Sequence, residues 1–409
     1  MTQASRPKTR MKIDLAGHFS IAIIDKQRPD SFYITAHLKE SLDPQALQTA
    51  VNDLVRRLPF LNGRFRSGFF WYFHEVLENP PQIVFAEDLP IFDDYYNTGD
   101  GHVLRVLYGK QHFTIQAIHS IVDGRGLSKL MRALLVRYFE VLGLTVEKGD
   151  IVDCSDPYHT EEAEDAYQSH TDFKKIYPAQ EKTKSKLSVY HHKGSKRAPQ
   201  RVVRKTFDLT KIKAASQAHK VTINEYLLAH IFKAFAEERN SRGCKKPIVS
   251  AIPIDCRRFL PSKTFRNFII NGTITMPETE DFSDMVQQIR GQFAKINHAF
   301  VQTEVNGLSK AMKAASFLPL GGKKLILRGM GQLDKLKRTT NFSNLGRVSL
   351  PQEVLARIEN LEFVINTPAH MPYSFACITA GEALTLAITV GVEEDTLAEK
   401  IMKHLDEAA

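Results

Sequence analysis

The segment with the clearest chemical potential is Ile118-His119-Ser120-Ile121-Val122-Asp123-Gly124. Apolar and polar residues alternate over 113–117, which predicts a half-buried strand that runs to His119. An apolar stripe over about 126–141 predicts a helix that begins just after the segment. The sequence therefore predicts an imidazole on a short turn between a strand and a helix. A neutral histidine in such a place suits proton abstraction from an alcohol or an amine.

The residues that follow His119 are of types that stabilise a turn. Asp123 is placed to cap the predicted helix or to form an ion pair with another segment. Gly124 and Gly126 admit backbone conformations that are closed to other residues. A lone histidine at the end of a strand is more often a structural polar residue than a base, so the turn alone does not establish catalysis.

The pattern His-x-x-x-Asp-Gly at 119–124 resembles the motif of the CoA-dependent acyltransferase superfamily. That superfamily includes chloramphenicol acetyltransferase, plant acyltransferases, the condensation domains of peptide synthetases and bacterial alcohol O-acetyltransferases. Other segments of the chain resemble it in the same order, so the resemblance covers most of the chain: Arg56–Pro59, Phe70–Tyr72, Val221–Glu225, Pro253–Arg258, Arg266–Phe268 and Asn341–Gly346.

Two departures narrow the resemblance. Many members have two consecutive histidines, whereas Ile118 stands at the first position here, and the catalytic role in the family belongs to the second, His119. The Asp-Phe-Gly-Trp-Gly segment of the plant and chloramphenicol types is absent, and Asn341–Gly346 stands in its place. The chain is thus most similar to free-standing bacterial alcohol acetyltransferases or to condensation-like proteins.

The resemblance implies an α/β fold of two chloramphenicol-acetyltransferase-like lobes, each a mixed sheet with helices, with a channel between them. We expect an N-terminal lobe at 1–155 that carries the motif, a polar crossover at 156–200 and a C-terminal lobe at 201–409. His119 would lie midway along the channel, with the donor and the acceptor entering from opposite faces. Because one chain holds both lobes, we expect a monomer.

The resemblance also assigns roles to particular residues. His119 would be the general base, and Asp123 with Gly124 would shape the turn. Asp123 would pair with Arg257, with Arg258 as the alternative because adjacent strand residues face opposite sides. Ser343 and Asn344 are candidates for stabilising the oxyanion or lining the channel, although they could equally form a polar strand end.

These roles predict an acyltransferase that moves an acyl group from a thioester, with acyl-CoA as the expected co-substrate, to a small-molecule or lipid acceptor. A hydroxyl acceptor is favoured over an amine. A condensation-like enzyme with a donor on an acyl-carrier protein and a non-catalytic binding protein remain as alternatives. The sequence assigns no residues to the CoA phosphates; the basic segments Gly321–Lys324 and Lys335–Arg338 are typical of solvated faces.

Composition excludes several other classes of protein. The 409 residues carry 55 Lys and Arg against 46 Asp and Glu, a net charge of +9, but no basic stripe with aromatic residues indicates nucleic-acid binding. The four cysteines, Cys154, Cys244, Cys256 and Cys377, form no zinc motif, no disulfide framework and no recognisable nucleophile signature, so we expect no metal, no permanently bound cofactor and a cytoplasmic protein. No apolar run is long enough for a transmembrane segment.

Further elements are predicted from local patterns. Residues 18–25 read as a first strand after a basic tail, and 69–76 as an aromatic strand. Thr222 and Glu225 form a plausible capping box for a long apolar helix. Residues 373–392 read as a closing hairpin that turns at Gly381.

Overall fold

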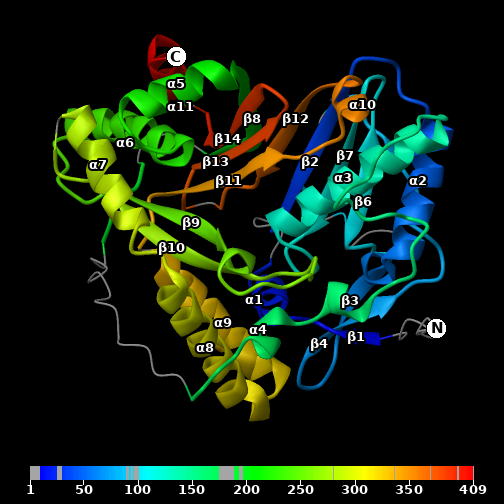
Figure 1. The fold of residues 1–409 in the computed structure, drawn as a ribbon. Coiled ribbons are helices and arrows are strands. Elements are labelled where there is room, and N and C mark those ends of the chain that lie inside the picture. Colours follow the sequence, from blue (N-terminus) through cyan, green and yellow to red (C-terminus); the bar gives the residue numbers. More distant parts are fainter. Residues whose placement is uncertain are drawn as a thin grey trace.

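A computed structural model of the chain describes residues 10–24, 30–88, 92–93, 95, 101–174, 188–192, 197–279, 281–335, 337–368, 370–393 and 396–408. It is a mixed α/β fold in which two large sheets stand side by side and carry helices on their outer faces (Figure 1). The first half of the chain forms most of one lobe and the second half most of the other. The expected two-lobed α/β fold is therefore confirmed.

The sheet of the first lobe has five strands in the order β12-β2-β7-β6-β5. Helices α2 and α3 share one hydrophobic core with it, because their apolar stripes face the same side. Asp43 caps α2 and Asp123 caps α3, each accepting a backbone N–H of the first turn. The elements are β2 (Ser31–Leu38), α2 (Pro44–Arg57), β5 (Val84–Phe85), β6 (Leu104–Tyr108), β7 (His112–Ile118), α3 (Gly124–Val141) and β12 (Ile358–Ile365).

The sheet of the second lobe has six strands in the order β10-β9-β11-β13-β14-β8. Its core is shared with α5, α6, α7 and α11. The capping box of Thr222 and Glu225 at the start of α6 is confirmed, as is the hairpin of β13 and β14, where Gly381 has a φ of 56°. The elements are β8 (Arg197–Asp208), α5 (Leu209–Ala218), α6 (Ile223–Ser241), β9 (Val249–Asp255), β10 (Ile269–Thr275), α7 (Phe282–Phe293), β11 (Thr340–Val348), β13 (Tyr373–Ala380), β14 (Ala383–Val392) and α11 (Thr396–Ala408).

The division of the chain into 1–155, 156–200 and 201–409 stays a prediction. One strand from 201–409 nevertheless belongs to the sheet of the first lobe. β12 comes from the C-terminal part of the sequence and pairs antiparallel with β2 of the first lobe. Next to it, Thr389 of β14 donates a hydrogen bond to the carbonyl of Ile365 at 2.6 Å. β12 therefore joins the two lobes. The crossover holds η3 (Thr160–Ala163) and the short α4 (Ala166–Ser169), while 175–187 and 193–196 lie outside the described residues.

The N-terminal segment differs from the prediction. Residues 15–23 form the helix α1 (Leu15–Ile23) and not a strand, because Asp14 accepts the N–H of Gly17 at 2.7 Å and begins a helical turn. A short apolar run does not distinguish a buried strand from a buried helix by its pattern alone. Before α1, β1 (Arg10–Lys12) pairs with β4 (Tyr72–Val76), which pairs with β3 (Gly63–Ser67). The aromatic strand predicted at 69–76 is thus shorter at its start.

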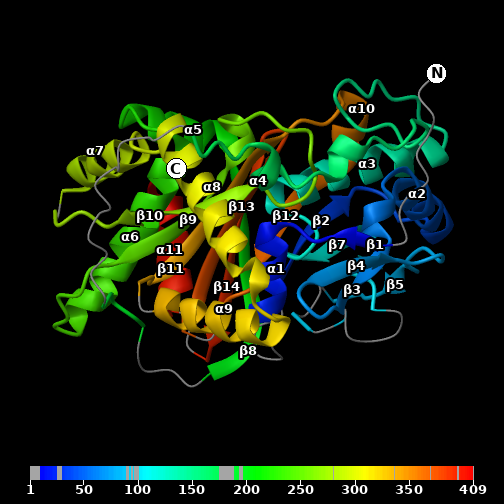
Figure 2. The same ribbon diagram turned by 90° about the horizontal axis from the view of Figure 1, so that it is seen from below.

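Two helices cover one end of the molecule. They are α8 (His298–Ala314) and α9 (Leu320–Lys335), joined by a short turn of 3₁₀ helix at Ala315–Phe317. Seen from below, α8 and α9 lie beside α1 (Figure 2), and α1 contacts both. Among the helices of the described residues, none is long and apolar enough to cross a membrane.

Candidate active site

His119 lies where β7 ends and the turn into α3 begins. Its backbone N–H donates to the carbonyl of Asp30 at 3.1 Å, which anchors the strand end. Its imidazole packs against the ring of Phe32 with 4.6 Å between centroids, and the residue is partly buried. The predicted position of His119 on a turn between strand and helix is therefore confirmed.

The imidazole is held by Asn267, which arrives from the loop between β9 and β10 of the other lobe. Asn267 Nδ2 donates to the backbone carbonyl of His119 at 2.8 Å and faces both carboxylate oxygens of Asp14 at 3.2 and 3.3 Å. These acceptors fix the orientation of the amide, so its Oδ1 faces His119 Nδ1 at 3.1 Å and must accept the hydrogen bond. In the neutral ring Nδ1 therefore carries the proton and Nε2 keeps its lone pair.

Asp14 is the third member of this arrangement. It is fully buried and receives hydrogen bonds from Asn267 and Gly17 and an ion pair from Arg266, whose Nε lies 3.3 Å from Asp14 Oδ2. Burial raises the pKa of Asp14, and the charge of Arg266 partly offsets that rise. Asp14 thereby connects the N-terminal helix α1 to the turn of His119 through Asn267.

Asp123 holds the same turn to the second lobe. It caps α3 by accepting the N–H of Gly126 at 2.7 Å, and its Oδ2 accepts Arg257 Nη1 at 2.9 Å and Phe268 N–H at 2.8 Å. Both partners of the ion pair are nearly inaccessible to solvent. Burial would lower the pKa of Arg257, but the carboxylates of Asp123 and Asp255 outweigh it and raise that pKa. The structure thus contains the expected Asp123–Arg257 pair, whereas the alternative, Arg258, is exposed.

Gly124 and Gly126 are required for a different reason from the predicted one. Neither has a positive φ. A Cβ on Gly126 would lie 1.9 Å from the carbonyl oxygen of Phe265, and one on Gly124 would lie 2.9 Å from Leu345 Cδ2. Glycine therefore lets the start of α3 approach the second lobe closely, and it supplies no unusual backbone conformation here.

Ser343 and Asn344 lie on β11, which contacts α3. They are part of a strand that pairs with β13 up to Asn344 and then shifts register before Arg347. Asn344 Oδ1 accepts the N–H of Gly346 at 2.8 Å, and Gly346 has a φ of 71°, which favours glycine. The side-chain carbonyl of Asn344 thus stabilises the bulge, while its amide N–H groups stay available as donors.

The cysteines give no sign of a competing nucleophile. Burial raises the pKa of Cys377 to about 12 and that of Cys154 to about 11, and it also raises the pKa of Cys256. Each of these three groups is therefore a protonated thiol at neutral pH. Among the described residues, no cluster of three or more His, Cys, Asp or Glu could hold a metal ion.

A cavity of about 500 Å³ lies between α1, α4, α8 and the β3–β4 hairpin. Its lining is largely apolar, with Leu15, His18, Trp71, Asp165 and Tyr167 among the residues that face it. The cavity borders the site through α1, since Gly17 of α1 packs tightly against the carbonyl of Ser120. Burial lowers the pKa of His18 to about 4, whereas burial and the neighbouring Asp14 raise that of Asp165 to about 6.

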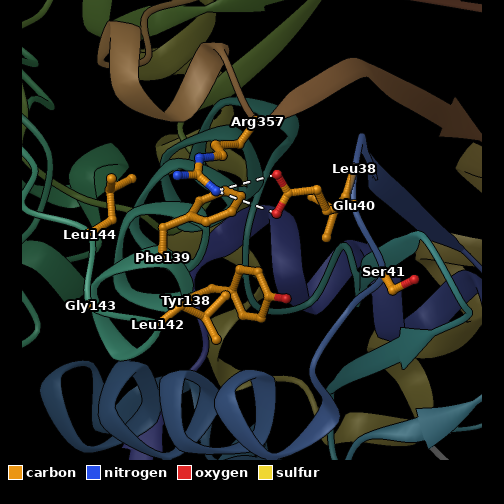
Figure 3. Close-up of a pocket in the computed structure, with 9 residues that line it drawn as sticks. All are labelled: Leu38, Glu40, Ser41, Tyr138, Phe139, Leu142, Gly143, Leu144 and Arg357. Carbon is orange, nitrogen blue, oxygen red and sulfur yellow. Dashed lines mark hydrogen bonds and ion pairs between the residues drawn. The ribbon is translucent and has the colours of Figure 1, made fainter.

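A second cavity of about 150 Å³ is unrelated to the site. Figure 3 shows Tyr138, Phe139 and the ion-paired Glu40 and Arg357 around it. It lies at the C-terminal end of α3, whereas His119 precedes the N-terminal end of this 18-residue helix, roughly 27 Å away along its axis.

Sequence reasoning identified His119, Asp123 and Arg257 but missed what Asn267 and Asp14 do. Asn267 stands in the resembling segment Arg266–Phe268 without a role of its own, and the sequence assigns no role to Asp14. The spacing of 253 residues between them in the chain leaves no local pattern that could have brought them together. The one signal in the sequence is an aspartate, a residue type that favours helix N-caps, directly before an apolar run.

Comparison with known proteins places these features in a family. The family model for alcohol acetyltransferase matches residues 164–407, which is more than half of the chain. The match begins after His119 and includes Arg257, Asn267, Ser343 and Asn344. A search of curated proteins gave no significant match.

Solved structures show the same fold at low sequence identity. Polyketide synthase associated protein 5 from Mycobacterium tuberculosis is 15% identical, with 97% of this chain and 96% of that chain covered and a TM-score of 0.63. TRI3 trichothecene 15-O-acetyltransferase from Fusarium sporotrichioides is 13% identical, with 98% and 94% covered and a TM-score of 0.62. The first condensation domain of the CDA synthetase is 11% identical, with 98% and 96% covered and a TM-score of 0.61. These three proteins share the fold of this chain, and by its family match the chain belongs to the alcohol acetyltransferase family.

Proposed function

We propose that this acyltransferase moves an acyl group from acyl-CoA to a hydroxyl group, with His119 as the general base. The observation that carries the proposal is the hydrogen bond from His119 Nδ1–H to Asn267 Oδ1. It selects the tautomer in which Nε2 has a lone pair to receive a proton. The fixed ring orientation lowers the entropy cost of placing that nitrogen beside a bound alcohol.

In the proposed reaction Nε2 of His119 takes the hydroxyl proton while the oxygen attacks the thioester carbonyl carbon. A C–O bond forms, and the carbonyl electron pair moves onto oxygen to give a tetrahedral oxyanion. When that intermediate collapses, the C–S bond breaks and the departing thiolate takes the proton from His119. The products are an ester and free CoA, and no covalent bond to the enzyme forms.

The oxyanion needs donors close to the place where its charge develops. We assign this role to the β11 bulge at Ser343 and Asn344, through the Asn344 amide or nearby backbone N–H groups. The location of β11 against α3, the helix that follows the His119 turn, supports this assignment. The hydrogen bond from Gly346 N–H leaves the Asn344 Nδ2 hydrogens free for such a role.

Replacement of the imidazole is the direct test. His119→Ala should lower turnover by about 10²–10⁴-fold, the usual contribution of general base catalysis, while donor binding changes little. His119→Asn should not restore the rate, because an amide does not accept the proton. His159→Ala, at an exposed histidine, is the matched control. Near-normal turnover of His119→Ala on true substrates would remove His119 from the mechanism and favour a binding protein.

The donor is tested with the same protein. Purified enzyme should acylate alcohols from acyl-CoA, detected by mass spectrometry of the ester. Condensation domains are among the structural neighbours, with which the chain shares only the fold. They make an acyl group bound to a carrier protein the second donor to test in this assay. Ester formation with an acyl-carrier protein and none with acyl-CoA would overturn the choice of donor and leave the role of His119 intact.

A further inference from the structure

In a surface helix the charged side chains are usually exposed and the apolar side chains buried, and several residues of helix α9 show the reverse. Lys323 is buried, with 4% of its surface exposed, while Leu325 is 75% exposed and Ile326 and Met330 are each at least half exposed. Lys323 Nζ donates to the carbonyls of Phe70 and Ser316 and lies 3.2 Å from the centroid of the Trp71 ring. The lysine thus fixes α9 to the β3–β4 hairpin, while Leu325, Ile326 and Met330 of the same helix face outward.

The exposed apolar residues of three elements gather at this end of the molecule. The N–H of Leu320 donates to the carbonyl of Phe69, so the start of α9 is joined to the tip of the hairpin. Figure 1 shows α8, α9 and the β3–β4 turn at the same end of the fold. We call this surface the apolar end; its residues are Phe69, Phe70, Phe317, Leu318, Leu325, Ile326 and Met330, all exposed. Single exposed apolar residues are ordinary, but a cluster of this kind marks an interaction surface.

The apolar end carries positive charge. Residues 305–333 contain five Lys and Arg (Lys310, Lys313, Lys323, Lys324 and Arg328) and no Asp or Glu. Lys310 and Arg328 are exposed, and Lys324 is partly so. A partner for this surface must therefore offer negative charge together with an apolar phase.

We propose that the apolar end binds the surface of an anionic lipid bilayer. Two of its three most exposed residues stand at turns, since Phe317 (86% exposed) follows α8 and Phe69 (74%) is at the hairpin tip, while the third, Leu325 (75%), lies in α9. Projecting aromatic tips suit insertion among acyl chains better than the closely complementary surface of a folded protein. Lysine and arginine beside them suit anionic head groups. A bilayer supplies both phases at once.

The 500 Å³ cavity borders the apolar end. Trp71 of the hairpin, Met312 and Lys313 of α8 and Ser316 of the following turn all line it. Of these, Trp71 and Ser316 directly adjoin Phe70 and Phe317 in the chain. Bound to a bilayer, the protein would receive an apolar alcohol dissolved in the lipid through this cavity, a step that rests on the proposed acyl transfer.

Vesicle co-sedimentation of the full chain tests the surface without any need for activity. We expect the protein to sediment with vesicles of equal parts phosphatidylcholine and phosphatidylglycerol, and much less with phosphatidylcholine alone. The bound fraction should fall as NaCl is added, because salt screens the exposed lysines. Protein that stays in the supernatant with both vesicle types would overturn the proposal.

Variants locate the binding on the structure. Phe317→Ser with Leu325→Ser should weaken vesicle affinity by about tenfold for each side chain removed from the apolar phase. Phe85→Ser, at an exposed phenylalanine on β5, is the matched control and should leave affinity unchanged. Lys310→Glu with Lys324→Glu should reduce binding to anionic vesicles, whereas Lys245→Glu with Lys246→Glu should not. Equal losses in the control variants, or none in the apolar-end variants, would overturn the assignment.

Two assays separate this proposal from the proposed function. With a short water-soluble alcohol, the Phe317→Ser/Leu325→Ser variant should keep wild-type turnover, and with a long-chain alcohol held in vesicles its rate should fall with its vesicle affinity. Vesicle binding in the absence of any acyl transfer would refute the proposed acyl transfer and leave the proposed bilayer-binding surface standing. The wild type could instead bind an acidic carrier protein and no vesicles, and the variant could lose that binding. This result would identify the apolar end as a protein-docking surface and refute the bilayer proposal.

Discussion

The turn of His119 and the apolar end differ in which side chains are buried and which are exposed. Around His119 the buried charges are paired: Asp123 with Arg257, Asp14 with Arg266 and Asn267. At the apolar end a lysine is buried while large apolar side chains face solvent. In the first region each of these charged side chains meets an oppositely charged or hydrogen-bonding partner within the chain. In the second region Lys323 also finds its partners within the chain, at the carbonyls of Phe70 and Ser316, but the large apolar side chains face solvent, and the proposed bilayer contact would account for them.

The largest stability effect should come from breaking the paired region. Asp123→Ala removes the cap of α3 and leaves Arg257 buried with Asp255 as its remaining carboxylate. Loss of one partner of a buried ion pair costs about 3–5 kcal/mol of unfolding free energy. Denaturant unfolding should show this loss together with lower activity. Glu161→Ala breaks the pair with Lys263, which is exposed on both sides, and should cost less than about 1 kcal/mol. Equal midpoints for the two variants would mean that burial of the pair contributes nothing.

A smaller effect should follow from loss of the amide that orients the base, and it should appear in turnover as well as in stability, because Asn267 is buried and also donates to Asp14. Asn267→Ala frees the imidazole of His119 to rotate and to change tautomer, so kcat should fall on the order of 10²-fold with KM little changed. Asn271→Ala removes an exposed asparagine on β10 and is the matched control. A normal kcat in Asn267→Ala would show that the ring needs no partner at Nδ1. A change in KM alone would place Asn267 in substrate binding instead.

The two regions also differ in how far the sequence predicted them. The strand, turn and helix around His119 follow from local patterns, and the pairing of Asp123 with Arg257 came from family resemblance. Asn267 and Asp14 could not be assigned roles, because their contact joins residues 253 positions apart. Helix α1 was predicted as a strand, since nine apolar-rich residues fit either structure.

At the apolar end local patterns failed for a physical reason. Gly321, Gly322 and Gly329 weaken the helical signal of α9, because glycine is a poor helix former. The outward position of Leu325 and Ile326 opposes the rule that assigns apolar residues to the core. The basic segment Gly321–Lys324 was interpreted as a solvated face, whereas Lys323 is buried. The pairing of β12 with the first lobe is likewise a long-range property that local patterns do not contain.

The pH dependence of stability should show how the two regions are joined, because His18 of α1 packs against Trp71 with 4.8 Å between ring centroids and 44° between the ring planes. Burial, with the charges of Arg266 and Lys323, lowers the pKa of His18 to about 4. The unfolded chain takes up this proton below about pH 6.5, and the folded chain only near pH 4. Stability is therefore lost as the pH falls through this window, by about 2 kcal/mol at pH 5.

The variant His18→Phe keeps an aromatic ring beside Trp71 and removes the titration. Its unfolding free energy should exceed that of the wild type at pH 5 by more than it does at pH 7. His74 and His230, with pKa values lowered to about 3 by burial, act in the same direction in both proteins, while Asp165, raised to about 6, opposes them. His159→Gln, at an exposed histidine, should not alter the slope. An unchanged slope in His18→Phe would show that His18 takes up its proton over the same pH range in the folded chain as in the unfolded chain.

The smallest effect is predicted for the apolar end itself. Phe317→Ser and Leu325→Ser exchange side chains that are 86% and 75% exposed, so neither should change the unfolding free energy by more than about 0.5 kcal/mol. Val305→Ser, on the buried side of α8, should cost about 2 kcal/mol or more, because it removes packed methyl groups and buries a hydroxyl. Chemical unfolding in the absence of lipid measures all three. A large loss in Phe317→Ser or Leu325→Ser would mean that these residues serve the fold, and the need for an outside partner would disappear. An unchanged stability beside a reduced vesicle affinity would separate the two roles, because the same residues would then contribute to binding and nothing to folding.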